Sequence, residues 1–574
     1  MKSFLEVRKN LTKSFEGFKN ISIAILADSA TQFISKALRG NGYEYRIAFD
    51  IYEADYDQLE AEVFNPTSSL YEFAPSYILI FNSPNKLYRQ FIKLPVQQQQ
   101  GFAAAYIEKV KTQLAAINKQ HNCRIIFSNF FEITDGLYGN YSNKLEHSWI
   151  TQVRSINHAL MSLAREEKNL FINDILTLQN YYGTEKLTDP KLYITSDIIL
   201  SLDGHAIVSK NITEIVAAIE GDQKKCLILD LDNTLWGGII GDDGIDKIQI
   251  GDLGIGKAFT EFQLWVKALK ERGIILAVCS KNNEDIAKEV FENHPDMVLR
   301  LEDIAVFIAN WNSKAENIKE IQKILNIGFD SMVFLDDNPV ERAMVLENIP
   351  GITVPDLPAD PALYLSYINS LNLFETASYS ETDSQRTKSY QDQVKRNLDL
   401  QYCTDETDFL KKLGMTSKVE SFNKFNIPRV AQLSQRSNQF NLRTVRYTDF
   451  EIRNIAEDDS YISFSFTLND KYGENGLISV VILKKKTPSS LFIDTWIMSC
   501  RVLKRGMEDF VLNQIVSAAK TGGFSVIEGQ FIPTPKNALV KDHYRNLGFT
   551  DKGDGYWELN TGSFKKRENF IEKE

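Results

Sequence analysis

Cys226-Leu-Ile-Leu-Asp-Leu-Asp-Asn-Thr-Leu-Trp-Gly-Gly238 is the stretch that decides the fold of this chain of 574 residues. Its apolar beginning predicts a short strand that is buried on both faces, as in a parallel sheet. Asp230 and Asp232 follow, and the alternation of side chains along a strand places both carboxylates on one side. Two unpaired carboxylates would repel each other, and their pKa values would rise. They are therefore either caps of the following loop or ligands of a divalent cation such as Mg²⁺, which binds few carboxylates together with a phosphate.

Three further stretches place polar residues beside apolar strands in the same way. Gly273–Cys279 is apolar and ends in Ser280-Lys-Asn-Asn283, and Ser331–Leu335 ends in Asp336-Asp337-Asn338. Between them, Lys314 opens an amphipathic segment that runs to Leu325. In chain order the four stretches supply Asp-x-Asp-x-Thr, then Ser, then Lys, then Asp-Asp.

This order of motifs resembles the haloacid-dehalogenase-type (HAD) phosphotransferases. The short flanking sequences Leu-Trp-Gly-Gly, Cys-Ser-Lys-Asn and Leu-Asp-Asp-Asn-Pro narrow the resemblance to the FkbH-like branch, subfamily IIIC. The resemblance implies that Asp230 is the nucleophile and that Asp232 is the general acid and base. It also implies that Mg²⁺ is held by Asp230, by the backbone carbonyl of Asp232 and by Asp336, with Asp337 beside the ion.

The same resemblance assigns the phosphoryl oxygens to Thr234, Ser280 and Lys314, whose ammonium is a good point charge for phosphate. It assigns the role of acyl-carrying thiol to Cys279. Simple burial at the end of an apolar strand is the alternative for this cysteine. Nearby Lys281, Lys314 and a bound cation are expected to lower its pKa and supply thiolate. Candidate helpers, or equally caps of loops, are Asn282, Asn310 and Asn312.

Composition narrows the class of protein. A net charge of −11 and a pI of about 5.4 argue against a nucleic-acid groove as the main site. The cysteines are scattered, with neither a metal-binding spacing nor a disulfide framework, which predicts a reducing compartment. The first residues carry charges throughout, unlike a signal peptide, and no apolar run reaches the roughly 18 residues of a membrane span. We therefore expect a cytoplasmic protein without a membrane anchor.

The first 220 residues alternate predicted strands and helices, which indicates a parallel sheet. Ser29 after the first strand, Asn129 after a later one and Asp203-Gly-His205 near the end resemble the layout of SGNH-type esterases. The glycine-asparagine block of that family is absent, and the Asp and His are one residue closer than usual. The alternative is that Ser29 caps a helix and that His205 is an ordinary surface or satisfied histidine. The resemblance then implies a degenerate domain that holds a partner.

The region from about Thr404 to Leu559 mixes strands with one long helix, and the sequence His543-Tyr-Arg-Asn-Leu-Gly-Phe549 lies near its end. This arrangement resembles GNAT acyltransferases. That fold binds the coenzyme A diphosphate at a helix N-terminus. Here the loop Arg501–Glu508 has one glycine, and Glu508 stands where a diphosphate would bind. A phosphopantetheine arm, which lacks that diphosphate, is tolerated better. The residues expected to bind a carrier protein or its pantetheine are Arg505, Gly506, Asn537 and Tyr544.

These features predict an α/β chain of three domains. The domains are a degenerate SGNH-like or flavodoxin-like parallel sheet (1–220), a HAD-like Rossmannoid parallel sheet (221–358) and a GNAT-like α+β domain with a charged tail (404–574). A linker and helical connector (359–403) joins the second domain to the third. The intervals between the HAD motifs cannot hold a separate cap domain, which needs about 50 residues. An open site of this kind suits a macromolecular partner that covers it.

The family implies one reaction for the whole chain. An acyl phosphate, D-1,3-bisphosphoglycerate, loses phosphate, and the glyceryl group passes through a cysteine thioester to the phosphopantetheine thiol of an acyl carrier protein. Two alternatives stay open: a HAD-type phosphatase of a small metabolite or phosphoprotein, and a non-catalytic factor that docks a carrier protein. The complete set of aspartates and Lys314 argues against the docking factor, because a scaffold does not need it.

Overall fold

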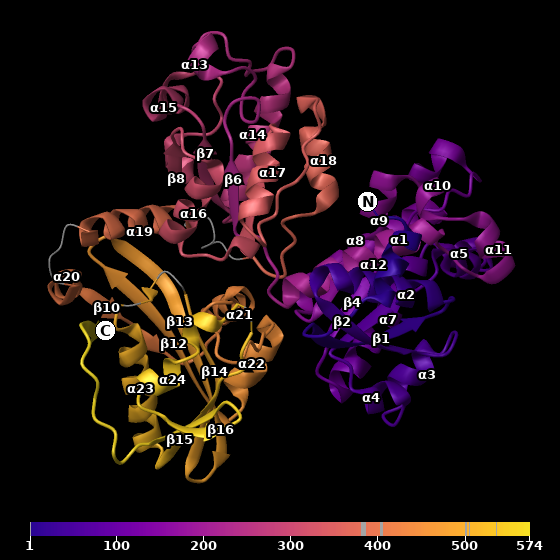
Figure 1. Cartoon of the computed structure of the whole chain (residues 1–574). Coiled ribbons are helices and arrows are strands. Elements are labelled where there is room, and N and C mark those ends of the chain that lie inside the picture. Colours follow the sequence, from indigo (N-terminus) through magenta and orange to yellow (C-terminus); the bar gives the residue numbers. More distant parts are fainter. Residues whose placement is uncertain (1, 380–385, 402–405, 500–501, 504, 535) are drawn as a thin grey trace. The chain divides into compact units, whose positions relative to one another are not determined.

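The chain folds into two compact units, Met1–Ala218 and Ile219–Glu574. The structure is a computed structural model that describes residues 2–379, 386–401, 406–499, 502–503, 505–534 and 536–574 (Figure 1). Cys403, Cys500 and parts of the loop Arg501–Glu508 and of the connector lie outside these residues. The other cysteines are buried thiols. No helix within the described ranges is long and apolar enough to cross a membrane.

The first unit is built on a parallel sheet of order β2-β1-β3-β4-β5. The strands β3 and β4 are apolar and almost fully buried, as expected for strands with helices on both faces. Residues Tyr43–Tyr45 form a 3₁₀ turn, so β2 begins at Ile47. The strands are β1 (Lys19–Ala27), β2 (Ile47–Glu53), β3 (Tyr77–Phe81), β4 (Arg124–Ser128) and β5 (Leu170–Asn173). The helices are α1 (Phe4–Lys9), α2 (Gln32–Gly42), α3 (Leu59–Phe64), α4 (Ser69–Phe73), α5 (Pro84–Ile92), α6 (Val96–Gln99), α7 (Phe102–Gln120), α8 (Trp149–Glu166), α9 (Ile175–Tyr182), α10 (Thr184–Leu187), α11 (Pro190–Ser196) and α12 (Leu202–Ile219).

The residues behind the SGNH resemblance have structural roles in this unit. His205 is buried, its Nδ1 shares a hydrogen bond of 2.8 Å with the Ser201 carbonyl oxygen, and burial lowers its pKa to about 4. His205 is therefore a satisfied histidine in the core and not a surface one. The capping alternative for Ser29 is wrong, since Thr31 occupies the N-cap of α2 and the Ser29 hydroxyl has no hydrogen-bond partner among the described residues.

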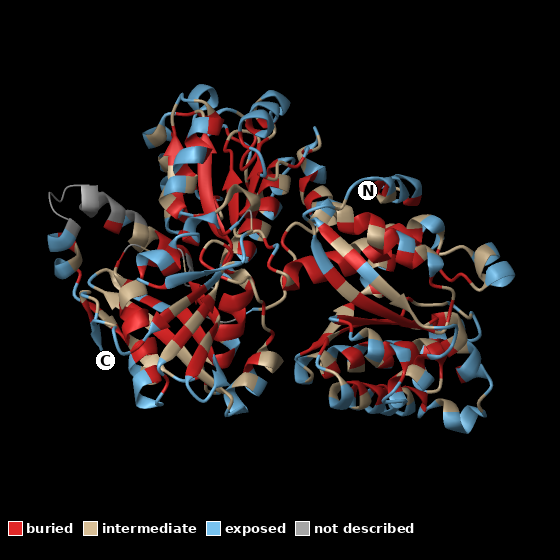
Figure 2. Cartoon of the chain, turned by 60° about the horizontal axis from the view of Figure 1, so that its bottom comes forward, coloured by how far each residue is buried: buried red, intermediate tan, exposed pale blue. Residues whose placement is uncertain are grey.

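The second unit contains a parallel sheet of order β8-β7-β6-β9, whose strands are buried along their length (Figure 2). Alternate side chains of β6 pack on two sides: Leu227 and Leu229 meet α14, α15 and α18, whereas Cys226 and Ile228 meet α16, α17 and α19. The strands are β6 (Cys226–Leu229), β7 (Ile275–Ser280), β8 (Ile304–Ala309) and β9 (Met332–Leu335). The helices are α13 (Ile240–Asp243), α14 (Gly256–Glu271), α15 (Glu284–Asn293), α16 (Lys314–Leu325), α17 (Pro339–Asn348), α18 (Tyr364–Leu371) and α19 (Arg386–Gln401).

Neither interval between the HAD motifs folds into a cap domain. Residues 231–255 hold the short helix α13 and a bridge between Gly237 and Gln249, and residues 281–303 hold α15 and one 3₁₀ turn. The mixed α/β architecture with parallel sheets agrees with the predicted fold class. The subdivision of the second unit into separate domains stays a prediction.

A second, mixed sheet occupies the C-terminal part of this unit, in the order β16-β17-β15-β14-β13-β12-β10-β18, with β11 paired to β12. The predicted long helix is α23, and Gly506 is its N-cap in a left-handed conformation (φ 76°). The strands are β10 (Met415–Ser417), β11 (Val419–Glu420), β12 (Tyr461–Asp470), β13 (Gly473–Thr487), β14 (Ser490–Met498), β15 (Val526–Gln530), β16 (Thr550–Gly553), β17 (Tyr556–Asn560) and β18 (Ile571–Lys573). The helices are α20 (Glu406–Lys412), α21 (Ile427–Arg436), α22 (Asp449–Glu457), α23 (Met507–Thr521) and α24 (His543–Asn546).

Candidate active site

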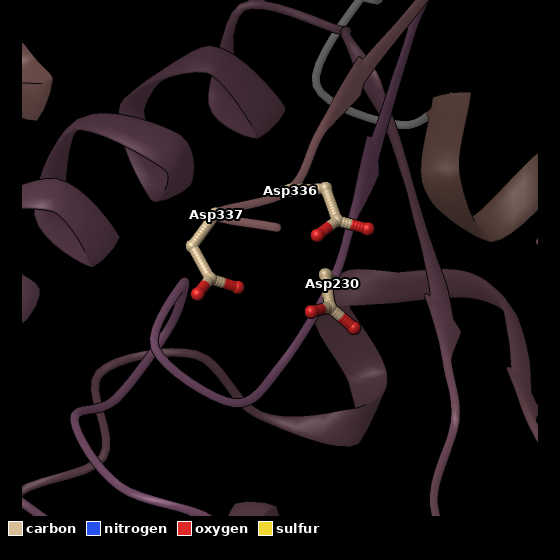
Figure 3. A group of neighbouring side chains, drawn as sticks. All are labelled: Asp230, Asp336 and Asp337. Atoms are coloured by element: carbon tan, nitrogen blue, oxygen red, sulfur yellow. The ribbon is translucent and has the colours of Figure 1, made fainter. Parts of the chain in front are cut away.

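The carboxyl ends of β6 and β9 bring three carboxylates together. Asp230 directly follows β6, and Asp336 and Asp337 directly follow β9, its neighbour in the sheet. Oxygen atoms of the three side chains lie within 4.8 Å of one another, and Figure 3 shows Asp336 above Asp230 with Asp337 to one side. The carboxyl end of a parallel sheet is where open α/β folds bind ligands.

Lys314, the first residue of α16, is the cation of this cluster. Its Nζ lies 2.6 Å from Asp336 Oδ2 and 3.0 Å from Asp230 Oδ1, and its side chain is 5% exposed. Burial alone would lower the pKa of Lys314, but the charges of Asp230 and Asp336 raise it, so the ammonium is retained. Burial raises the pKa of Asp230 to about 7, and Asp336 adds to this effect while Lys314 opposes it.

The cluster fits a divalent cation. Three carboxylates face one ammonium, which leaves negative charge in excess, and burial followed by Asp336 raises the pKa of Asp337 as well. Asp230 Oδ1 is buried and makes no hydrogen bond of good geometry within the described part of the chain, although it forms the ion pair with Lys314. A buried acceptor of this kind is suited to coordinate Mg²⁺, which prefers oxygen ligands.

Asp232 is held apart from that cluster. The strand β6 ends at Leu229, so both aspartates lie beyond the regular alternation of strand side chains, and Asn233 turns the chain with a left-handed backbone (φ 54°). The Asp232 carboxylate accepts hydrogen bonds from Trp236 and Asn282 and from one backbone amide. It is not a member of the carboxylate cluster, so its predicted metal role rests on its backbone carbonyl alone.

The predicted phosphate ligands Thr234 and Ser280 are both buried at the site. Thr234 Oγ1 accepts a hydrogen bond of 3.2 Å from the Asp337 amide and so joins the first motif to the last. Ser280 is the last residue of β7, and its Oγ accepts a weak hydrogen bond of 3.4 Å from Asn282. Both positions adjoin the carboxylates, and their contact with a phosphoryl group stays a prediction.

Cys279 lies inside the protein core. Its side chain is fully buried on the face of the sheet that α16 and α17 cover, and its Sγ lies 3.7 Å from the Lys314 carbonyl oxygen. Burial raises the pKa of this thiol, and Lys314 offsets only part of that effect, so the lysines alone do not supply the expected lowering. Lys281, the other expected neighbour, instead pairs with Glu341 at 2.5 Å. The acyl-carrying role of Cys279 stays a prediction that requires this thiol to become exposed.

Comparison with known proteins identifies relatives of the chain. Residues 22–217 match the family model described as FkbH, N-terminal domain. The N-terminal part of the protein BF1531 from Bacteroides fragilis, solved as a fragment that contains a phosphatase domain complexed with Mg, is 47% identical with a TM-score of 0.64. The match covers 100% of that structure and 66% of this chain. The chain belongs to the FkbH-like family. No curated protein matches the sequence.

This FkbH-like protein therefore has a HAD-type phosphatase domain, and the prediction of Mg²⁺ agrees with the ion bound in the Bacteroides protein. Solved acetyltransferases also match. They include the ribosomal-protein-S18-alanine N-acetyltransferase from Escherichia coli (13% identity, TM-score 0.21, 27% of this chain and 100% of that one). Another is a spermidine N-acetyltransferase from Vibrio cholerae in complex with CoA and spermine (13%, 0.21, 26% and 96%). Matches with TM-scores this low do not establish a shared fold, so the GNAT-like and SGNH-like domains stay predictions.

The four residues predicted to bind a carrier fall into two pairs. Arg505 and Gly506 line a cavity of about 780 Å³, whose apolar wall includes Phe409, Leu413 and Leu503. The guanidinium of Arg505 lies 3.0 Å from Asp470 Oδ2.

Asn537 and Tyr544 do not line this cavity. The amide of Asn537 donates to the carbonyl oxygens of Asn441 and Ile532 at 2.9 Å, and Tyr544 packs so closely on Gly529 that a Cβ there would lie 2.4 Å from its ring. Their environment is that of structural residues.

Arg342 is a site residue of this FkbH-like protein that the sequence did not reveal. Its buried guanidinium donates to the carbonyl oxygens of Asp336 at 2.8 Å and Asp337 at 2.6 Å, and to Asp356 Oδ1 at 2.5 Å. It thereby fixes the backbone that carries two of the carboxylates. The available signal was an arginine in the first turns of the helix after Asp-Asp-Asn-Pro.

Replacing Arg342 by alanine is expected to weaken both the fold and the metal site. Loss of buried, charge-assisted hydrogen bonds should lower the free energy of unfolding by about 1.5–3 kcal/mol. Mg²⁺ affinity should fall with it, because the two aspartate backbones lose their anchor. Urea unfolding and Mg²⁺ titration measure the two effects. Arg300→Ala, which removes a 3.0 Å hydrogen bond to the Phe291 carbonyl oxygen, is the matched control and should weaken the fold without changing Mg²⁺ affinity.

Proposed function

We propose that this FkbH-like protein removes phosphate from a phosphorylated acyl phosphate, such as 1,3-bisphosphoglycerate, and transfers the acyl group to an acyl carrier protein. The observation that carries the proposal is the buried group of Asp230, Asp336 and Lys314, with Asp232 beside it. Phosphoryl transfer needs mainly positioning and charge neutralisation, and this group supplies both. Mg²⁺, held by Asp230, Asp336 and the Asp232 carbonyl, would neutralise charge on the transferring phosphoryl group.

Asp230, Asp232 and Lys314 have different roles in the hydrolysis of a phosphate ester. An Asp230 oxygen bonds to phosphorus while the bond from phosphorus to the ester oxygen breaks, and Asp232 gives a proton to that oxygen. Water then attacks the phosphorus of the aspartyl phosphate, and Asp232 takes its proton. The bond from phosphorus to the Asp230 oxygen breaks, which releases inorganic phosphate and restores the Asp230 carboxylate. Lys314 stabilises the phosphoryl oxygens in both steps.

At the acyl phosphate group of the substrate, the nucleophile must attack the acyl carbon and not the phosphorus. If Asp230 took the phosphoryl group from that end, the acyl group would leave as a free carboxylate and lose its activation. A thiolate that attacks the acyl carbon expels phosphate and keeps the acyl group as a thioester. We therefore assign the ester phosphate to Asp230 and the acyl carbon to a thiol, for which Cys279 is the candidate.

A simple phosphatase is the second candidate, and the burial of Cys279 favours it. One experiment separates the two functions. The full chain is incubated with Mg²⁺, 1,3-bisphosphoglycerate and a holo-carrier protein, and the intact mass of the carrier is measured. A carrier heavier by one glyceryl group supports the proposal, whereas free phosphate with an unmodified carrier supports a simple phosphatase.

The cavity beside Arg505 is proposed to receive the carrier's phosphopantetheine arm without acetyltransferase activity. Leu539 lines the cavity and is 59% exposed, so Leu539→Asp should fold while it disturbs the apolar wall. We expect a rise of about tenfold in KM for the holo-carrier, equivalent to about 1.4 kcal/mol. Phe425→Asp, at a residue that is 83% exposed and lies outside the cavity lining, is the control and should leave KM unchanged. Micromolar binding of acetyl-CoA with acetyl transfer to an amine would contradict this role.

A further inference from the structure

The Asp232 carboxylate is fixed by hydrogen bonds from separate parts of the chain. Its Oδ1 accepts from Trp236 Nε1 at 2.9 Å and from the Ile240 amide at 3.1 Å. Its Oδ2 accepts from Asn282 Nδ2 at 2.9 Å. Trp236 is fully buried and Asn282 nearly so, which means that neither donor is free to turn to solvent. The carboxylate therefore has one preferred orientation.

The loop after β6 is shaped to present the indole of Trp236. The backbone amides of Thr234, Leu235 and Trp236 converge on the Leu231 carbonyl oxygen. The Asn233 side chain accepts from the Gly238 amide at 2.9 Å. These bonds close a tight turn that places the Trp236 ring edge-on to Phe291, at 6.1 Å between ring centroids. The turn thus anchors the indole from two sides and directs its N–H at Asp232.

The distribution of these bonds distinguishes the two oxygens of Asp232. A carboxylate offers about four lone-pair sites, two on each oxygen. Both sites of Oδ1 are used, whereas Oδ2 receives a single donor from the described residues. The remaining lone pair, and hence the position for a transferable proton, is on Oδ2. A general acid must reach its partner within about 2.6–3.2 Å, so orientation decides whether it works.

We propose that Trp236 and Asn282 are positioning residues that hold Asp232 so that its Oδ2 delivers the proton to the leaving oxygen. This role rests on the proposed phosphatase function. As the bond from phosphorus to the leaving oxygen breaks, the proton moves from Oδ2 to that oxygen, and Asp232 remains as a carboxylate. An alkoxide leaving group needs this proton, whereas a nitrophenolate leaves without it.

The dependence on leaving group provides the test. Trp236→Phe keeps an aromatic ring and removes the N–H, and Asn282→Ala removes the other side-chain donor. We measure leaving-group release in a single turnover with Mg²⁺, so that hydrolysis of the aspartyl phosphate does not enter. Since general acids contribute about 10²–10⁴-fold, each variant should lose at least about tenfold with glycerol 3-phosphate. The loss with p-nitrophenyl phosphate should stay below about threefold. Trp265→Phe, which alters a ring stacked on Phe262 in the same domain, is the matched control.

A double-variant comparison shows whether the effect passes through Asp232. In an Asp232→Asn background, adding Trp236→Phe should cost less than about twofold more, because the proton donor is already absent. Equal losses on both substrates, or fully additive losses with Asp232→Asn, would overturn the positioning role. If Trp236→Phe does not fold, Asn282→Ala decides the matter alone by the same criteria. A wild-type protein that releases neither leaving group would instead overturn the proposed function.

Discussion

Asp230→Asn is expected to abolish Mg²⁺-dependent phosphate release, with a loss of at least about 10³-fold, because an amide oxygen cannot replace the carboxylate as nucleophile. Asparagine has nearly the same shape, so the packing at the end of β6 is retained. The substitution also removes one negative charge from a cluster in which Asp336 and Asp337 face a single ammonium, Lys314. Phosphate release from p-nitrophenyl phosphate measures the effect.

The same substitution, although it abolishes activity, is not expected to lower the melting temperature. Burial raises the pKa of Asp230 to about 7, and the charge of Asp336 adds to this effect, although Lys314 opposes it. Asp230→Asn should therefore melt at the same or a higher temperature than the wild type in the absence of Mg²⁺. Added Mg²⁺ should stabilise the variant less than the wild type, because one ligand is missing.

An exposed aspartate of the same domain provides the control for both measurements. Asp246→Asn removes one carboxylate outside the cluster and should change neither turnover nor the stabilisation by Mg²⁺. Retention of more than a few per cent of activity by Asp230→Asn would show that another group attacks phosphorus. Equal stabilisation of variant and wild type by Mg²⁺ would remove Asp230 from the metal site.

The parts of the site that follow strands directly could be predicted from the sequence. Asp230 and Asp336 end adjacent parallel strands, and the carboxyl ends of such strands meet at one edge, so their approach follows from the sheet alone. Lys314 is the first residue of an amphipathic helix that packs on the same sheet, and the resemblance to HAD phosphotransferases implied its place beside the two aspartates. For these residues, the local sequence pattern and the order of the strands in the sheet predict the same position at the carboxyl edge of the sheet.

Other residues depend on tertiary contacts that a linear pattern does not encode. In the sequence, Trp236 is only one more apolar residue after β6. The turn at Asn233 is what directs the indole N–H of Trp236 to Asp232. Arg342 donates hydrogen bonds to backbone carbonyl oxygens. Every residue has such a group, so no side-chain motif in the sequence indicates this contact. In the C-terminal sheet, Asn537 had the pattern of a ligand-binding residue but supports a loop through its amide.

The position of Cys279 illustrates a different limit. Alternation along β7 puts Cys279 and Ala277 on one face and Val278 on the other, and this much was available from the sequence. Which helices cover each face was not available. Because α16 and α17 cover the Cys279 face, proximity to the catalytic edge did not produce an exposed thiol.

Cys279→Ala is expected to abolish loading of the carrier protein if this thiol carries the acyl group. The wild type, incubated with 1,3-bisphosphoglycerate, should gain a mass that hydroxylamine removes, since hydroxylamine cleaves thioesters. The variant should lack that mass and leave the carrier unmodified. Its fold should be retained, because alanine removes only one sulfur atom from the core, at a cost of about 1–2 kcal/mol.

Cys226→Ala is the matched control for this prediction. Cys226 is an equally buried thiol in the same cluster, at the opposite end of the sheet from the carboxylates, and burial raises the pKa of both thiols. Cys226→Ala should therefore have the same effect on stability and none on loading. Transfer through Cys279 also requires the thiol to be uncovered in part of the population, so maleimide labelling of Cys279 should become faster when the acyl phosphate binds. If Cys279→Ala loads the carrier at the wild-type rate, the carrier's own thiol attacks the acyl phosphate directly, and Cys279 serves only to pack the core.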